Sequence, residues 1–143
     1  IDKFDTIIYT GLSGAIVAIP LAQRLGKTLC CVRKEKSHSS HQLEGILGKK
    51  SLVIDDFMES GKTLEYIFNK TKDRTQITHV VLYACRFGKI NTIAKCKSIF
   101  NLRPIFMDKR FFTRVDKKWD TIKKKKDIKY GTHLAYSPPK SVS

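Results

Sequence analysis

The 143 residues are enough for one domain with its own hydrophobic core and too few for a second full domain. With 28 lysines and arginines against 13 aspartates and glutamates, the formal net charge is +15, which indicates an anionic partner: a polyphosphate metabolite or a nucleic acid. The longest apolar stretch, residues 12–21, is too short and too interrupted by Ser13, Gly14 and Pro20 to span a bilayer, so we expect no membrane partner.

The first part of the chain alternates strand-like and helix-like segments. Residues 4–9 are predicted to form a buried strand, residues 15–25 repeat apolar positions at three and four as a helix does, and residues 28–32 are predicted to form a second strand. Gly26 is placed to end the helix. Residues 35–50 are polar and show no sustained period, which predicts mainly a loop.

The alternation continues through the second part of the chain. We predict a strand at residues 51–54, a helix at 63–72, a strand at 77–84, a helix at 90–100 and a short strand at 103–107. This order predicts an α/β fold, a mostly parallel sheet flanked by helices, with ligands beyond the carboxyl ends of the strands. Residues 1–107 would form this core, and residues 108–143 a basic C-terminal cap or tail.

The cysteines, Cys30, Cys31, Cys85 and Cys96, indicate the compartment. They form no C-x-x-C pair and have no zinc-finger spacing with a histidine. Cysteines without such a pattern are typical of a reducing interior, so we expect a cytoplasmic location.

The C-terminal quarter scatters Phe111, Phe112 and Trp119 among many lysines and contains the unbroken basic run Lys123–Lys126. Such a run is typical of a solvated face, and an RNA contact or a dimer-facing arm is the alternative. The aromatic residues could stack on a base, but packing in a core or cap is the commoner use of such residues. We therefore assign no base-binding residue.

The segment Leu52–Thr63, LVIDDFMESGKT, carries the clearest chemistry. Asp55 and Asp56 end an apolar strand, where paired carboxylates can accept hydrogen bonds from a vicinal diol or hold a hydrated metal. Residues 60–63 then offer small side chains, hydroxyls and free N–H groups at a helix start, which suits a monophosphate. A nucleotide-triphosphate P-loop is excluded because Asp56 stands where its first glycine is needed. Two solvated acids before an ordinary capped helix are the structural alternative.

This segment resembles the phosphoribosyl pyrophosphate (PRPP) binding motif of type I phosphoribosyltransferases, in which an apolar strand leads to two acids and a small, hydroxyl-rich loop. The resemblance implies that Asp55 and Asp56 take the ribose 2′ and 3′ hydroxyls. The residues that it implies for the 5′-phosphate are Met58, Glu59, Ser60, Gly61, Lys62 and Thr63. The residues that depart from the usual pattern are Ser51, Phe57 and Glu59.

Two further segments are similar to the family in their order. The implied pyrophosphate loop is Thr10, Gly11, Leu12, Ser13 and Gly14, for which a glycine turn of purely structural purpose is the alternative. The implied basic strand end and closing loop, most similar to the orotate branch, contribute Arg33, Lys34, Lys36 and His38. For His38 a solvated loop histidine is the alternative.

The resemblance implies a Rossmann-like core with a small or reduced hood. It implies an enzyme of nucleotide metabolism, such as purine or pyrimidine salvage, that transfers the 5-phosphoribosyl group from PRPP to a nucleobase-like acceptor and releases pyrophosphate. It further implies a homodimer, and Mg²⁺ held mainly by substrate and water, so no metal ligand is assigned.

Two other functions fit the same sequence. One is a PRPP- or nucleotide-sensing regulator on the same fold, without catalysis, that binds RNA or DNA through its basic surface. The net charge of +15 favours this alternative. The other is a partner-binding domain whose acid pair is vestigial.

Overall fold

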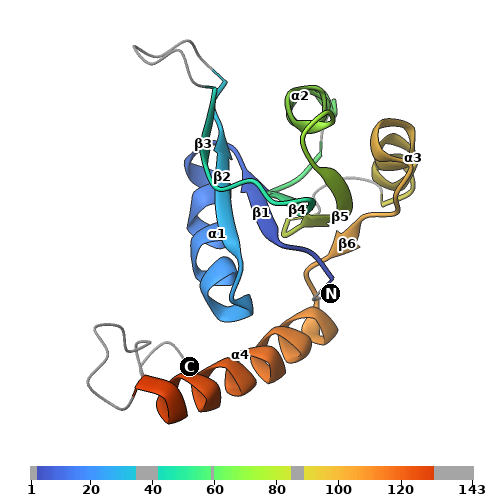
Figure 1. Ribbon diagram of the computed structural model, residues 1–143. Coiled ribbons are helices and arrows are strands. Elements are labelled where there is room, and N and C mark those ends of the chain that lie inside the picture. The colour runs from blue at the N-terminus through green and yellow to red at the C-terminus, as the bar shows by residue number, and fades with distance from the viewer. Residues whose placement is uncertain (1–2, 35–41, 59, 85–88, 131–143) are drawn as a thin grey trace.

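A six-stranded sheet with helices on both faces organises the chain (Figure 1). The computed structural model describes residues 3–34, 42–58, 60–84 and 89–130. In chain order the elements are β1 (Thr6–Tyr9), α1 (Gly11–Leu25), β2 (Thr28–Val32), β3 (Leu43–Gly45), β4 (Lys50–Asp55), α2 (Lys62–Thr71), β5 (Gln76–Leu82), α3 (Lys89–Phe100), β6 (Ile105–Phe106) and α4 (Lys109–Tyr130).

The strand order in the sheet is β3-β2-β1-β4-β5-β6. Only the edge pair β2 and β3 is antiparallel, and every other neighbouring pair is parallel. This confirms the predicted α/β fold with a mostly parallel sheet. The chain moves outward from β1 to β2 and β3, and then returns to add β4 on the other side of β1. β1 and β4 therefore flank a topological switch point, where open α/β sheets form their ligand crevice.

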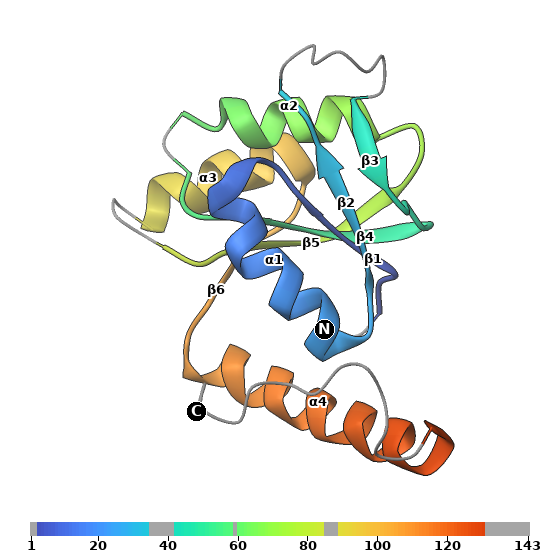
Figure 2. The same cartoon turned by 90° about the vertical axis from the view of Figure 1, so that its left-hand side faces the viewer.

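Two hydrophobic clusters cover the two faces of the sheet. One face packs against α1 and α4 through residues such as Ile7, Leu52 and Ile54. The other face packs against α2 and α3 through Ile8 and Val53, among others. Figure 2 shows α2 and α3 above the sheet and α1 and α4 below it. Strands buried on both faces need apolar residues at consecutive positions, which explains the uninterrupted apolar runs in β1, β4 and β5.

The segment 35–50, predicted to be mainly a loop, contains β3 and the first residue of β4, while its other described residues, 42 and 46–49, have no regular structure. β3 has three residues, Leu43–Gly45, of which Leu43 is half-buried and the other two are exposed. So short an edge strand has no room for an alternating pattern, which is why the sequence does not reveal it. Residues 35–41 lie outside the described residues.

The segment after β6 forms the 22-residue helix α4, which the sequence reading missed. Phe111, Val115 and Trp119 recur at every fourth position and are buried. Phe111 and Val115 share a cluster with the core residues of α1, and Arg24 of α1 pairs with Asp116 of α4 at 3.4 Å. Within the described ranges, no helix is both long enough and apolar enough to cross a membrane.

The burial of α4 decides how its aromatic residues can be used. Phe111 and Trp119 are only 3% and 8% exposed, so both pack in the core, as the sequence favoured. Phe112 is 52% exposed and its ring meets that of Phe111 edge to face.

The end of α1 generates a testable prediction. Gly26 adopts φ 67°, and a Cβ added there would lie 3.2 Å from Cδ1 of Ile122 on α4. We expect Gly26→Ala to lower the free energy of unfolding by about 1–2 kcal/mol for the left-handed backbone, with a further loss from the contact. Urea denaturation measures the total loss in the parent chain. Repeated in a chain that carries Ile122→Val, which lacks Cδ1, it measures the backbone cost alone. Unchanged stability would contradict this account of the helix end.

Candidate functional site

A polar pocket of about 300 Å³ lies beyond the carboxyl ends of β1, β2 and β4. Four segments far apart in the sequence supply its walls: the start of α1, the end of β2, the acid pair and the turn before α2. The pocket brings together most of the residues singled out from the sequence, namely Thr10, Gly11, Ser13, Lys34, Asp55, Asp56, Met58, Ser60, Gly61, Lys62 and Thr63. Phe57 and Leu64 also line it.

Other residues singled out from the sequence lie elsewhere. Leu12 is 78% exposed outside the pocket, and Gly14 is buried where a Cβ would lie 3.2 Å from Cβ of Tyr9. Arg33 forms an ion pair with Glu44 of β3 at 3.1 Å. Lys36, His38 and Glu59 lie outside the described residues.

The first pocket wall is the start of α1, which begins at Gly11 and not at residue 15 as predicted. Thr10 is still extended, and Gly11 alone turns the chain into the helix with φ 68°. A glycine tolerates that left-handed conformation, so one residue is enough for the turn. The hydroxyl of Thr10 donates to the carbonyl of Val32 at 2.5 Å and does not cap the helix. The first N–H groups of α1 therefore remain available to a ligand.

The second pocket wall is the start of α2, which also lacks a side-chain cap. Gly61 precedes the helix with φ 79°, and Ser60 Oγ accepts only a long contact of 3.4 Å from the Lys62 N–H. Lys34 reaches this helix start from the end of β2, where its ammonium donates to Oγ1 of Thr63 at 3.1 Å. A free helix N-terminus beside a lysine attracts anions.

The acid pair faces these two helix starts. Asp55 is only 6% exposed, and its Oδ1 accepts the N–H of Asp56 at 2.9 Å. The half-buried Asp56 accepts the N–H of Phe57 at 2.7 Å through Oδ1. Burial raises the pKa of Asp55 to about 6, and the adjacent Asp56 carboxylate adds to the increase. Each side chain keeps a second carboxylate oxygen that could accept a hydrogen bond from a hydroxyl.

The same carboxylates decide which metal the pocket suits. Nowhere in the described chain do three or more histidine, cysteine or acidic side chains gather around a possible metal position. Two neighbouring carboxylates are too few for a metal held by protein alone, but they fit Mg²⁺, which keeps several waters and takes substrate oxygens as further ligands. Asp55 and Asp56 are the residues that would hold it.

Tyr83 supports the pocket from outside its lining, a role that the sequence did not indicate. It follows β5, and its hydroxyl donates to the carbonyl of Ser13 in the first turn of α1 at 2.8 Å. Burial raises its pKa, and the carboxylates of Asp56 and Asp55 add to the effect. Tyr83 thus ties the first pocket wall to the end of β5. An aromatic residue at a strand end is the only signal in the sequence, and it does not identify a partner.

Comparisons with known proteins agree with this architecture. No protein-family model matches the chain, and no curated protein matches it either. Solved structures do match. UMP synthase from Leishmania donovani has a TM-score of 0.59 and 17% sequence identity, and the match covers 85% of this chain. Orotate phosphoribosyltransferase from Aeropyrum pernix has a TM-score of 0.58 and 22% identity, with 80% of this chain covered. Orotate phosphoribosyltransferase from Mycobacterium tuberculosis, in complex with PRPP, has a TM-score of 0.57 and 19% identity, with 73% of this chain covered.

The match covers 26% of the UMP synthase chain, 66% of the Aeropyrum enzyme and 61% of the Mycobacterium enzyme. The fold and the pocket first define an α/β protein with its ligand crevice at the β1/β4 switch point. More closely, the fold is that of the type I phosphoribosyltransferases, which confirms the fold that the motif at residues 52–63 suggested.

The raised pKa of Asp55 predicts a pH-dependent stability difference. Between its unfolded value of about 3.9 and its folded value of about 6, the native carboxyl holds a proton that the unfolded chain has lost, so rising pH destabilises the fold. Asn keeps an oxygen for the Asp56 N–H but does not ionise. We expect Asp55→Asn to match the parent near about pH 4 and to exceed its free energy of unfolding by on the order of 2 kcal/mol near about pH 7.

Urea denaturation of Asp55→Asn and the parent across this pH range measures the difference. A gap that did not grow between the two pH values would show that burial of the ionised carboxylate has no effect on stability.

Proposed function

We propose that the chain transfers the 5-phosphoribosyl group from PRPP to a nucleobase-like acceptor and releases pyrophosphate. One observation carries the proposal: a single pocket joins a vicinal-diol acceptor, Asp55 and Asp56, to two uncapped helix starts and Lys34. PRPP has the matching groups, because a ribose diol lies between a 5′-phosphate and a 1-pyrophosphate. The likeness of the fold to phosphoribosyltransferases, one of them in complex with PRPP, supports the same substrate.

The three parts of PRPP divide among the three parts of the pocket. Asp55 and Asp56 would accept hydrogen bonds from the 2′ and 3′ hydroxyls. The turn 58–63 would hold the 5′-phosphate at the start of α2, where backbone N–H groups are available. The start of α1, residues 10–14, would hold the pyrophosphate. Lys34 would neutralise its charge from the start of α2, and Arg33 would join it on leaving its ion pair with Glu44. The family resemblance adds Lys36 and His38.

The reaction needs no protein nucleophile. The C1–O bond to pyrophosphate breaks, its electron pair leaves with the pyrophosphate, and C1 passes through a sugar cation before bonding to a nitrogen of the acceptor, which loses its proton to solvent. The protein contributes by positioning the sugar and by stabilising the negative charge that develops on pyrophosphate. Lys34 and the N–H groups of α1 act on that charge. Bound Mg²⁺ would add charge neutralisation at the phosphate oxygens.

The acceptor and the assembly follow from the family resemblance alone, and the location follows from the cysteines. A nucleobase-like acceptor, a homodimer and a cytoplasmic location are our proposals. Cys30, Cys31 and Cys96 are unpaired, as a reducing compartment requires. Phe112 is the most exposed aromatic side chain of the described part of α4, but it does not line the pocket.

Loss of both carboxylates tests the sugar assignment. We expect PRPP with Mg²⁺ at about 100 times its Kd to stabilise the parent by about 2.7 kcal/mol, and the Asp55→Asn, Asp56→Asn double variant to lose this stabilisation and pyrophosphate release. Thermal shift and a pyrophosphate assay measure the two effects. The matched control is Asp73→Asn, Asp120→Asn, which removes the same charge outside the pocket. Equal PRPP binding by the acid-pair variant and the parent would refute the sugar assignment.

Lys34 tests whether a cation in the pocket binds the phosphates of PRPP. Its ammonium is held by Thr63 at 3.1 Å in the pocket, so Lys34→Gln removes a cation without emptying the core. We expect PRPP to bind at least about tenfold more weakly, since a hydrogen bond to a charged group contributes about 1.5–3 kcal/mol. Titration calorimetry measures this, with Lys70→Gln on the exposed side of α2 as the control. Equal affinities of the two variants would contradict the role of Lys34.

The second candidate function is a PRPP- or nucleotide-sensing regulator that binds RNA or DNA. The net charge of +15 favours it. The two candidates differ in turnover: PRPP-induced stabilisation without pyrophosphate release, across a panel of nucleobases, would identify the regulator. Absence of PRPP-induced stabilisation would instead favour a partner-binding domain with a vestigial acid pair.

A further inference from the structure

Over residues 110–124, where the side chains of α4 are described, one face of the helix carries only basic and hydroxyl side chains. Arg110, Arg114, Lys117 and Lys124 are exposed, and their spacing of four, three and seven residues aligns them along the helix. Thr121 occupies the remaining position of this row. We call the four charged residues the basic stripe. It extends over about 21 Å at 1.5 Å per residue.

The two acidic residues of α4 whose side chains are described each pair with a cation outside the basic stripe. Asp116 pairs with Arg24 of α1 at 3.4 Å, and Asp120 pairs with Lys123 at 3.5 Å. Asp120 lies three residues after Lys117 and four before Lys124, so it borders the stripe, but its carboxylate pairs with Lys123. Over residues 110–124 the stripe therefore keeps an excess of positive charge.

The first residues of the stripe face a hollow beside the ends of β5 and β6. This hollow, of about 580 Å³, is lined by Arg103, Arg110 and Arg114. Its one acidic lining residue, Asp108, accepts the N–H of Phe111 at 3.0 Å through its carboxylate. Three guanidinium groups around one hollow extend the positive surface beyond α4. Guanidinium groups bind phosphates through paired hydrogen bonds.

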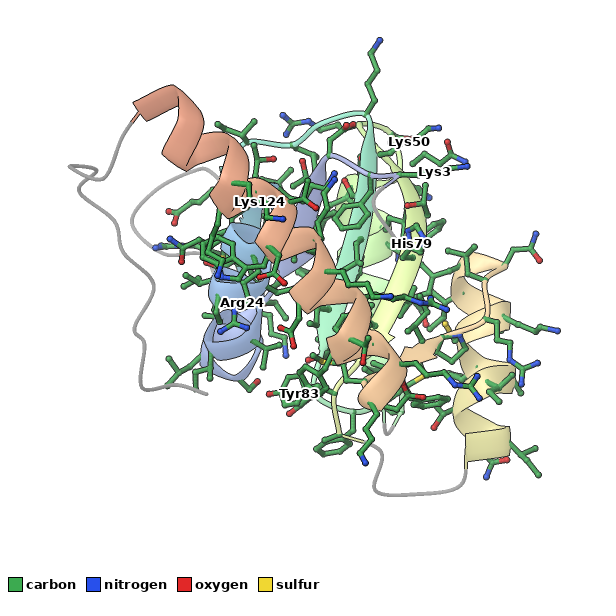
Figure 3. The ribbon with its side chains drawn as sticks, turned by 90° about the horizontal axis from the view of Figure 1, so that it is seen from below. Lys3, Arg24, Lys50, His79, Tyr83 and Lys124 are labelled. Atoms are coloured by element: carbon green, nitrogen blue, oxygen red, sulfur yellow. The ribbon has the colours of Figure 1, made fainter. Side chains whose placement is uncertain are left out.

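The opposite face of α4 fixes the stripe in place and limits its partners. Phe111, Val115 and Trp119 are buried, so the stripe must face outward. Figure 3, which views the molecule from below, shows α4 in front of α1 and labels Lys124 on α4. A helix that enters a membrane surface needs a free apolar face, which α4 has already buried. A protein interface needs an apolar centre, and the stripe contains no apolar residue.

We propose that the basic stripe, with Arg103, binds the phosphate backbone of a nucleic-acid duplex. Its length of about 21 Å equals the rise of about six base pairs at 3.4 Å each, so the stripe is long enough to reach several phosphates of a duplex. The stripe carries no aromatic side chain on which unpaired bases could stack, which favours a duplex over a single strand. None of these residues lines the PRPP pocket, so the two proposals can fail independently.

Fluorescence anisotropy with a labelled DNA duplex of about 20 base pairs tests the stripe, with titrations between about 50 and 200 mM KCl. The variant is Arg110→Gln, Arg114→Gln, Lys117→Gln and Lys124→Gln, because Gln keeps a helix propensity close to that of Arg and Lys. We expect the slope of log K against log salt to fall in magnitude by about 3–4, and binding at about 100 mM salt to weaken at least about tenfold.

The matched control neutralises four exposed cations outside α4: Lys49→Gln, Lys72→Gln, Arg74→Gln and Lys97→Gln. It makes the same change in net charge, so a specific stripe requires near-parental binding by the control. Helix content, melting temperature and pyrophosphate release should match the parent in both variants. Equal loss by the control, no duplex binding by the parent, tighter binding to the single strand, or binding to phosphatidylserine vesicles in place of DNA would each overturn the proposal.

Discussion

Two helix N-termini without side-chain caps share one pocket with a pair of carboxylates, and the rest of the site depends on this arrangement. A free helix start leaves N–H groups unsatisfied and carries a partial positive charge. Gly11 and Gly61 make it possible, because their positive φ values turn the chain without a capping residue. An anion bound between the helices would satisfy the same groups that an ordinary cap does. Such a ligand would therefore complete the hydrogen bonding of the two helix starts.

The strand ends are tied together so that this arrangement stays in place. Thr10 binds the end of β2 through its hydroxyl, and Tyr83 binds the first turn of α1 from the end of β5. The backbone carbonyls of Asp55 and Asp56 accept the N–H groups of Tyr83 and Ala84 at 3.1 and 2.6 Å. The acid pair thus sits on the sheet and not on a free loop. Rigid placement holds the buried carboxylate of Asp55 and the half-buried carboxylate of Asp56 at a fixed separation from the helix starts.

The sequence was informative where buried apolar runs and special chemistry coincide. The runs around Ile7, Val53 and Val80 predicted the parallel sheet, and Asp55 and Asp56 indicated its ligand edge. The start of α1 and the contact of Tyr83 with Ser13 could not be predicted, because one residue's φ and a long-range hydrogen bond leave no local pattern. Ser51, polar where an apolar residue is usual, is buried with its hydroxyl 2.6 Å from that of Thr75, a partner that only the fold reveals.

The basic C-terminal segment shows why a run in the sequence is a poor guide to a surface. Lys123 and Lys124 are neighbours in the chain, but Lys123 pairs with Asp120 and lies 5.7 Å from the Trp119 ring centroid, whereas Lys124 is exposed in the row of Arg114 and Lys117. The continuous surface is built from residues three, four and seven apart. Its orientation is fixed by the buried apolar face of α4, so packing against α1 determines which cations act together.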